Sequence, residues 1–373
     1  MTTRPQTHHA DHVGSLLRPA LVKEARRRHF EEKAISALEL KAVEDAAVRD
    51  LVRMQEAIGL PVVTDGEVRR SFWHYDFMGA LEGLDLVQRE HAAGVQFHGV
   101  NLRPTFPTIT GPLDFPDDHP MLEHFKFLAG VARAIPKISI PGPSCCHFRT
   151  AKADIHPKEY LDPEALFAAI ARTYAKAVQK FYEAGCRYLQ LDDIFFAHLC
   201  DARIREEKWQ EGQDPDELIQ RYAQMMHDAI AQRPADMLIG MHVCRGNFKS
   251  TWIAEGPYDR VADAIFNQIG ADIYFLEYDS DRAGGLEPLR FLKKGTQRVF
   301  PGFITTKTGV LESLDDLKRR FEEATKYADL NQLGIAPQCG FASTEEGNTI
   351  TEDDQKRKLE LVVRTSEAIW GSV

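Results

Sequence analysis

The run MLIGMHVC, residues 237–244, is the stretch that best indicates the fold. It is short and apolar, and it precedes a segment of helical period at 258–269 and a second apolar run, DIYFLEYD, at 272–279. Short apolar runs that alternate with longer helical segments are the pattern of parallel strands joined by crossover helices. The stretch therefore predicts one β–α–β unit of an α/β fold.

The same alternation extends along the whole chain. The first candidate strand lies around Val13. The other seven end at Glu67, near Gly142, at Asp193, at Cys244, at Asp279, near Thr305 and near Cys339. Helical segments lie at 38–58, 163–184, 216–232, 258–269, 311–327 and 354–370. Eight such strands with intervening helices predict a (β/α)8 TIM barrel. We expect residues 1–373 to form one barrel and the turn-rich residues 68–134 to be an insertion after its second strand.

Composition and charge exclude several classes of protein. The chain of 373 residues has a formal net charge of -10, which disfavours binding to nucleic acid. No apolar stretch approaches the roughly 18 residues of a membrane span, and the polar N-terminus lacks the apolar core of a secretory signal. The six cysteines are too sparse for a secreted disulfide scaffold, so we expect reduced thiols and a cytoplasmic protein. The sequence leaves a homo-oligomer open.

Four side chains that could bind a metal follow three of the expected strands. His242 and Cys244 are two residues apart in one strand and so point to the same side, while Glu277 and Cys339 end two other strands. In a barrel these positions converge on one face. One imidazole, two thiols and one carboxylate suit Zn²⁺ better than Mg²⁺ or Ca²⁺. Taken singly, each of these side chains could also have a purely structural role. A buried cysteine is often just a small hydrophobic residue, and a carboxylate often caps a loop.

Further polar side chains are expected on the same face. Ser15 follows the first strand, Glu67 the second, and the pair Asp192 and Asp193 the fourth. Carboxylates near a dication could hold the ammonium group of a substrate. The alternative is that they cap loops or pair with neighbouring arginines such as Arg69 or Arg70. Their number on one rim favours substrate binding.

Several motifs together resemble a known family. They are HVGSLLRP, VVTDGEVRRSFW, LQLDD, HVCRGN, YFLEYD, TTKTGVLES and PQCGFAS, and they extend from about His12 to Trp370. They resemble the catalytic barrel of cobalamin-independent methionine synthase, in its short single-barrel branch. The resemblance implies that His242, Cys244, Glu277 and Cys339 bind zinc. It also implies that Ser15, Glu67 and Asp192 hold the amino-acid part of homocysteine.

The chain departs from this family in the region expected to bind the methyl donor. Full-length synthases have an additional N-terminal half, and they carry a tryptophan that stacks on folate where this chain reads GPSCCHF, with Cys145, Cys146, His147 and Phe148. Where the larger enzymes have a histidine proton relay, this chain reads FITTKTG, so Lys307 or a neighbouring threonine lies in that neighbourhood. Lys307 and Asp192 are the candidate catalytic residues. We expect methyltetrahydrofolate to be a poor donor.

The leading hypothesis is a zinc-dependent thiol S-methyltransferase of the 5-methyltetrahydropteroyltriglutamate–homocysteine S-methyltransferase kind. Its partners would be a small-molecule thiol and a methyl or other alkyl donor. An alternative with the same activated thiolate is an epoxyalkane:coenzyme M transferase, in which Lys307 or an arginine would meet a sulfonate. A third hypothesis is a binding protein with structural zinc. The glutamate ligand disfavours it, because closed structural sites are usually richer in cysteine and histidine.

Overall fold

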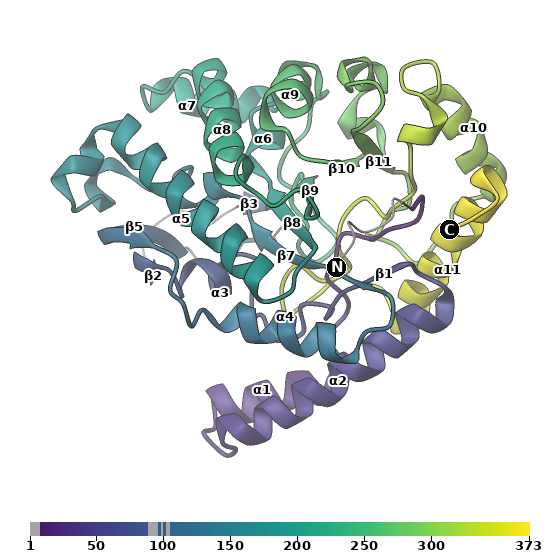
Figure 1. Cartoon of the computed structure of the whole chain (residues 1–373), viewed down its shortest axis with the longest axis horizontal. Helices are drawn as coiled ribbons and strands as arrows, with labels where there is room; N and C mark the ends of the chain where they lie inside the picture. The colour runs from purple at the N-terminus through teal and green to yellow at the C-terminus, as the bar shows by residue number, and fades with distance from the viewer. Residues whose placement is uncertain (1–7, 89–95, 98–99, 102–104) are drawn as a thin grey trace.

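A computed structural model describes residues 8–88, 96–97, 100–101 and 105–373. A parallel sheet of five strands in the order β11-β10-β9-β8-β7 lies at its centre (Figure 1). The strands are β7 (Ile138–Pro141), β8 (Tyr188–Asp193), β9 (Leu238–Val243), β10 (Ile273–Glu277) and β11 (Arg298–Gly302). All their residues are buried, which explains why the sequence shows continuous apolar runs and no alternation.

The parallel arrangement continues beyond this sheet. The second expected strand, β1 (Val62–Val63), pairs in parallel with β6 (Ile135–Pro136), just before β7. The eighth expected strand forms isolated parallel bridges. They join Leu333 to Val299, Pro337 to Ile304, and Ile335 to Ala10 of the first expected strand. The first expected strand contacts the end of the second through a hydrogen bond from the Leu16 N–H to the Gly66 carbonyl oxygen, at 3.0 Å. The predicted α/β fold with a parallel sheet is therefore confirmed.

Helices cover the outside of this arrangement. Their bounds are α1 (Ala20–Phe30), α2 (Ala37–Ile58), α3 (Tyr75–Met78), α4 (Pro120–Val131), α5 (Pro163–Glu183), α6 (Phe195–His198), α7 (Ala202–Gln210), α8 (Pro215–Ile230), α9 (Asp259–Asp263), α10 (Leu314–Ala324) and α11 (Glu352–Trp370). Short 3-10 helices are η1 (Pro143–Cys146), η2 (Lys152–Asp154), η3 (Lys158–Leu161), η5 (Asp281–Ala283), η6 (Glu287–Phe291) and η7 (Leu330–Gln332), and η4 (Ala264–Ile269) is a π-helix. The last helix, α11, packs on both α10 and α2, so the helical layer returns to its start (Figure 1).

Local sequence explains where the long helices begin and end. Ser36 and Glu39 form a capping box at the start of α2, and Gly59 ends that helix with φ of 95°. Asp162 accepts the N–H of Glu164 at the start of α5, as expected for an N-cap. Among the described residues, no helix combines the length and hydropathy needed to cross a lipid bilayer.

The segment 68–134 contains secondary structure of its own. The antiparallel pair β2 (Glu82–Gln88) and β5 (Thr105–Asp114) is its main feature, beside a small hairpin of β3 (Gln96–Phe97) and β4 (Val100–Asn101). Residues 89–95, 98–99 and 102–104 of this segment lie outside the described part. That the segment is an insertion into one catalytic domain stays a prediction.

A buried ion pair ties the first strand position to the third. The Lys137 Nζ lies 2.8 Å from Asp11 Oδ1, and both side chains are 0% exposed. Tyr188 donates its hydroxyl to Asp11 Oδ2 at 2.8 Å, and Lys137 Nζ lies 4.6 Å from the centre of the Phe275 ring. The interior of the sheet is therefore partly polar, with its charges matched.

Candidate metal centre and active site

The strand register brings the four expected metal ligands together. Asp192 of β8 pairs with His242 of β9, and the β9–β10 ladder ends at Val243 and Leu276. Cys244 and Glu277 each come one residue after that last pair. Cys339 follows the eighth strand position, and its Sγ lies 3.5 Å from that of Cys244. Ligand atoms of His242, Cys244, Glu277 and Cys339 all lie within 4.8 Å of one another, and all four residues are buried.

The hydrogen bonds around the cluster fit a tetrahedral zinc site. His242 Nδ1 lies 3.3 Å from the Phe275 carbonyl oxygen, which accepts its proton. Nε2 is buried and makes no hydrogen bond of ordinary geometry. This is the arrangement of a metal-binding histidine, in which the second nitrogen fixes the ring and the tautomer. A hydrogen bond from the Cys244 thiol lowers the pKa of Cys339 to about 5, and the same contact raises the pKa of Cys244.

Glu277 is held by a backbone amide and by a positive side chain. Its Oε1 accepts the backbone N–H of Arg245 at 2.8 Å, and its Oε2 lies 2.9 Å from Arg282 Nη2. Burial opposes ionisation, but Arg282 and then Lys307 outweigh it and keep the pKa of Glu277 below its usual value. Glu277 is therefore an ionised carboxylate with a second partner, Arg282, within reach.

Lys307 lies behind the cluster, away from the cavity. Its Nζ lies 3.2 Å from Asn247 Oδ1 and 3.1 Å from the Thr251 carbonyl oxygen. It is not among the residues that line the cavity. The structure therefore places Lys307 where it fixes the loop that follows β9, a position that does not favour contact with a substrate.

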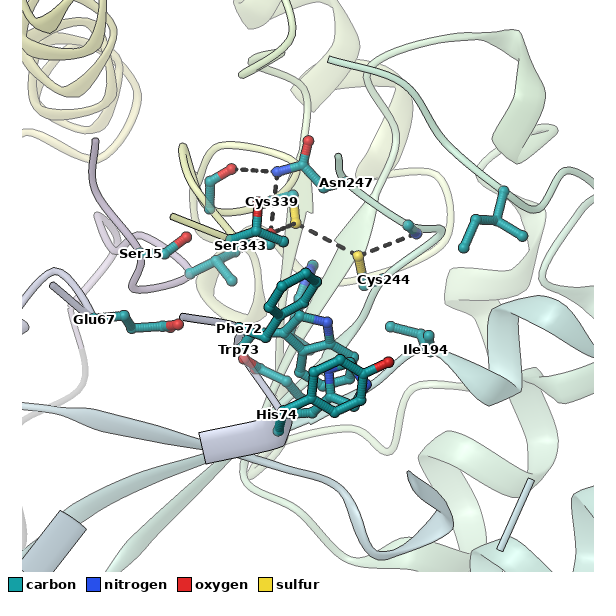
Figure 2. Close-up of a pocket in the computed structure, with 18 of the residues that line it drawn as sticks. Ser15, Glu67, Phe72, Trp73, His74, Ile194, Cys244, Asn247, Cys339 and Ser343 are labelled. Carbon is teal, nitrogen blue, oxygen red and sulfur yellow. Dashed lines mark hydrogen bonds between the residues drawn. The ribbon is translucent and has the colours of Figure 1, made fainter. Parts of the chain in front are cut away.

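One cavity unites most of the expected site. The expected residues Ser15, Glu67, Asp192, His242, Cys244 and Cys339 all line it. Figure 2 shows Ser15 and Glu67 to one side of the Cys244–Cys339 pair. The metal ligands and the expected substrate-binding groups thus face the same space. Asp193 points elsewhere, since it accepts the Ser144 hydroxyl and the N–H of Phe195.

Glu67 and Asp192 form an acidic pair in this cavity. Ser139 donates to Glu67 Oε1 at 2.8 Å, and Arg70 Nη1 lies 3.4 Å from Oε2. Glu67 has φ of 57°, a backbone conformation that is costly for a residue with a side chain and is often found at functional sites. Burial, and also the Glu67 charge, raise the pKa of Asp192 to about 7. Such a pair favours a cationic ligand.

Ser15 is placed by its contact with the loop after the eighth strand position. Its carbonyl oxygen accepts the Phe341 N–H at 2.9 Å, and its hydroxyl accepts the Ala342 N–H at 3.3 Å. A Cβ on Gly340 would lie 1.9 Å from Ser15 Oγ. Glycine at 340 therefore leaves the space in which the Ser15 hydroxyl lies beside Cys339.

The cavity also contains residues that the sequence analysis did not single out. Phe72, Trp73, His74 and Tyr75 form one wall, which we call the aromatic wall; Figure 2 shows its first three rings next to the thiol pair. The His74 ring centre lies 4.4 Å from that of Trp73 and 4.0 Å from that of Tyr75. The only sequence signal was the run of four aromatic rings, FWHY, that begins five residues after Glu67.

Asn247 is a second residue that was missed. Its side-chain amide donates to the Gly340 carbonyl oxygen at 2.7 Å and to Ser343 Oγ at 3.3 Å (Figure 2). It therefore joins the loop that carries Cys244 to the loop that carries Cys339. No sequence pattern indicates this bridge, because the two loops are about ninety residues apart in the chain.

The loop after the third strand does not expose its aromatic ring to the cavity. Phe148 stacks on Phe195, with ring centres 4.1 Å apart and planes at 20°. It lines a neighbouring groove and is absent from the lining of the cavity. Cys145 and Cys146 are buried, and burial raises the pKa of Cys146 to about 12. The structure therefore gives this loop no free surface on which a folate ring could stack inside the cavity.

Comparisons with known proteins agree with this geometry. Residues 10–359 match the family model described as "Cobalamin-independent synthase, Catalytic domain". The chain is 45% identical over 363 residues to the uncharacterized protein YxjG of Bacillus subtilis, covering 97% of this chain and 94% of that one. It is similar to the crystal structure of a putative vitamin-B12 independent methionine synthase from Listeria monocytogenes, with a TM-score of 0.78, 37% identity, and coverage of 99% and 100% of the two chains. A B12-independent methionine synthase from Shewanella, solved with selenomethionine, shares the fold at 18% identity and a TM-score of 0.71, with 98% of each chain covered.

Proposed function

The chain belongs to the family of cobalamin-independent synthase catalytic domains, and we propose on that premise that it is a zinc-dependent thiol S-methyltransferase. The acceptor would be homocysteine or a similar amino-acid thiol. The observation that carries the proposal is the cluster of two thiols, an imidazole and a carboxylate beside a cavity that also contains an acidic pair.

His242, Cys244, Glu277 and Cys339 would hold the zinc. Zinc bound there would lower the pKa of the substrate thiol, so that its sulfur could attack the methyl carbon while the bond to the donor breaks and the donor keeps the electron pair. The chain's own residues orient the acceptor for this attack. Glu67 and Asp192 would bind the ammonium group of the acceptor, and the Ser15 hydroxyl, which lines the same cavity as Cys339, would contact the polar end of the acceptor.

We assign Lys307 to positioning and not to catalysis. It holds the loop that carries Cys244 through Asn247, and its charge helps to keep Glu277 ionised. The role of Asp192 as a proton donor stays a prediction beside its proposed contact with substrate.

The alternative, an epoxyalkane:coenzyme M transferase, has less support from the metal end of the cavity. A sulfonate thiol would face two carboxylates there, Glu67 and Asp192, and would be repelled by either when ionised. An amino-acid thiol would be attracted to the same groups.

Two measurements on the purified protein test the proposal. Elemental analysis should find one zinc per chain, and Cys244→Ser and Cys339→Ser should lose most of it, while Cys186→Ser, a buried cysteine outside the cluster, should keep it. The zinc-loaded protein should consume the free thiol of homocysteine with methyltetrahydrofolate, its polyglutamate or methylcobalamin, and we expect the folates to be the poorer donors. Full zinc in both serine variants, or consumption of coenzyme M and epoxypropane in place of homocysteine, would overturn it.

A further inference from the structure

Arg149 is a cation of the cavity that has no counter-ion among the residues that the structure describes. It follows the loop after the third strand and is partly buried. It is the one lysine or arginine among the described residues that line the cavity, and it makes no hydrogen bond or ion pair with any residue in the described ranges. Burial lowers its pKa, and among the described residues the groups that oppose this effect are Tyr75 and Cys145, not carboxylates.

Several other arginines near the site are paired with carboxylates, and Arg149 differs from them. Arg245 also makes no ion pair in the described part of the chain, but it is fully buried against the Tyr258 ring and does not line the cavity. Arg26 lies 3.0 Å from Glu44, Arg70 lies 3.4 Å from Glu67, and Arg282 lies 2.9 Å from Glu277. A charge that loses water without gaining a partner is destabilising, so a chain that keeps one at a cavity wall keeps it at a cost in stability. Such a group is most simply explained by a ligand that supplies the missing anion.

The surroundings of Arg149 are aromatic. Its guanidinium carbon lies 6.0 Å from the centre of the Phe195 ring, and Phe195 lines the same cavity. Burial, and then the Arg149 charge, lower the pKa of His74, so Arg149 also lies near the aromatic wall. A guanidinium beside flat rings suits a ligand that is planar or apolar along most of its length and anionic at one end.

Arg149 also lies where the cavity meets a neighbouring groove. Arg149 and Ile253 line both spaces. Of the three other cations of the groove, Arg203 lies 2.7 Å from Glu207 and Lys208 lies 2.7 Å from Glu211, whereas Lys152 is exposed and makes no ion pair with a described residue. Arg149 differs from all three because it also lines the cavity, where an anionic group that enters from the groove would meet it.

We infer that Arg149, Phe195 and the aromatic wall form a second subsite for a co-substrate with a planar or apolar body and a carboxylate or sulfonate. The inference rests on the proposed function only where it calls this ligand a co-substrate. The binding itself can be measured without turnover, so a failure of methyl transfer would leave the subsite to be judged separately.

Isothermal titration calorimetry of the zinc-loaded protein with benzoate, benzenesulfonate and neutral benzamide tests the subsite. One charged hydrogen bond predicts that at least one of the anions binds about tenfold more tightly than benzamide. Arg149→Gln should abolish that preference, and Arg149→Lys should keep part of it. Arg203→Gln removes a groove arginine that is already paired, and it should leave the preference unchanged.

Equal binding of the anions and benzamide to the unaltered protein would overturn the inference. A preference that survives in Arg149→Gln would also overturn it, because the anion would then bind at the metal or elsewhere. Steady-state kinetics show which reactant carries the anion: a higher KM for the methyl donor alone in Arg149→Gln places it on the donor, and a higher KM for the thiol alone places it on the acceptor. Unchanged KM values for both reactants would contradict its role in a co-substrate.

Discussion

At the scale of single residues, the site is built from groups that are individually costly. Glu67 has a left-handed backbone, Arg149 has no counter-ion among the described residues, and Glu277 is ionised at 0% exposure beside Arg282. A ligand in the cavity would compensate the first two costs, and a bound metal would add a second partner for Glu277. This is why the residue scale indicates function more clearly than the fold does.

The acidic pair gives a prediction about which thiol is used. Glu67→Gln and Asp192→Asn should each weaken kcat/KM for homocysteine by about 1.5–3 kcal/mol, the range of a hydrogen bond to a charged group. Their zinc content should stay that of the unaltered protein. The comparison is with 4-mercaptobutanoate, which lacks the amino group. Equal losses with both thiols would remove the ammonium contact.

The glycine beside Ser15 gives a second prediction. Gly340→Ala would place a methyl group 1.9 Å from Ser15 Oγ and 3.0 Å from its Cβ, so the serine must move. We expect overpacking to lower the free energy of unfolding by about 1–3 kcal/mol. The KM for the thiol should rise, and zinc should be retained. The control is Gly130→Ala, because a Cβ at Gly130 would lie in open space. Gly185 also has open space but a φ of 99°, so Gly185→Ala would be strained and is not a suitable control. An unchanged KM in Gly340→Ala would mean that Ser15 does not contact the thiol.

At the scale of elements, prediction succeeded where a strand or helix has a strong local pattern. The buried strands β8, β9 and β10 and the capped helices α2 and α5 were predicted within a few residues. The metal ligands followed from them, because strand ends in a parallel sheet meet on one side.

Prediction failed where tertiary contacts decide the structure. The eighth strand contains Pro337, which has no N–H for a ladder, and a Cβ on Gly334 would lie 2.4 Å from the Phe300 ring, so this segment forms only bridges. The helix α7 was not predicted, because it is polar overall. The aromatic wall and Arg149 were missed because nothing local shows that both face the cavity.

Helix α4 gives a prediction about pH. His119 caps it, with Nδ1 accepting the Met121 N–H at 3.2 Å and Nε2 lying 3.1 Å from the Phe77 carbonyl oxygen, which accepts its proton. Burial lowers the pKa of His119 to about 4. As pH falls below about 6.5 the unfolded chain takes up the proton first, so this stabilisation is present above that pH and is lost towards pH 4.

Urea unfolding at pH 7 and pH 5 measures the effect. The linkage predicts a loss on the order of 2 kcal/mol from His119 between these two values. His119→Asn keeps an N-cap acceptor that does not titrate. Between pH 7 and pH 5 the loss in its free energy of unfolding should therefore be smaller than that of the unaltered protein, by about 2 kcal/mol. The exposed His156→Asn should keep the pH dependence of the unaltered protein. The same pH dependence in all three proteins would contradict the assignment.

At the scale of the whole molecule, the interior must hold together strand positions that are distant in sequence. The Lys137–Asp11 pair does this at 0% exposure, joining the start of the chain to the third strand position. Removing one partner of a buried pair leaves an uncompensated charge, which costs roughly 3–5 kcal/mol, whereas removing both charges costs far less. The pair therefore differs from the surface pairs of this protein.

Three variants separate these effects in urea unfolding. Lys137→Met should lower the free energy of unfolding by about 3–5 kcal/mol, because the Asp11 carboxylate would lose its lysine and keep only the Tyr188 hydroxyl, the His12 N–H and the His8 ring. The double variant Lys137→Met with Asp11→Asn should recover much of that loss, since neither charge remains. Lys126→Met removes an exposed partner of Glu123 and should change stability by less than about 1 kcal/mol. If the double variant is as unstable as the single one, the loss in the free energy of unfolding comes from packing around the lysine side chain. The first and third strand positions would then be held together by packing and not by the ion pair.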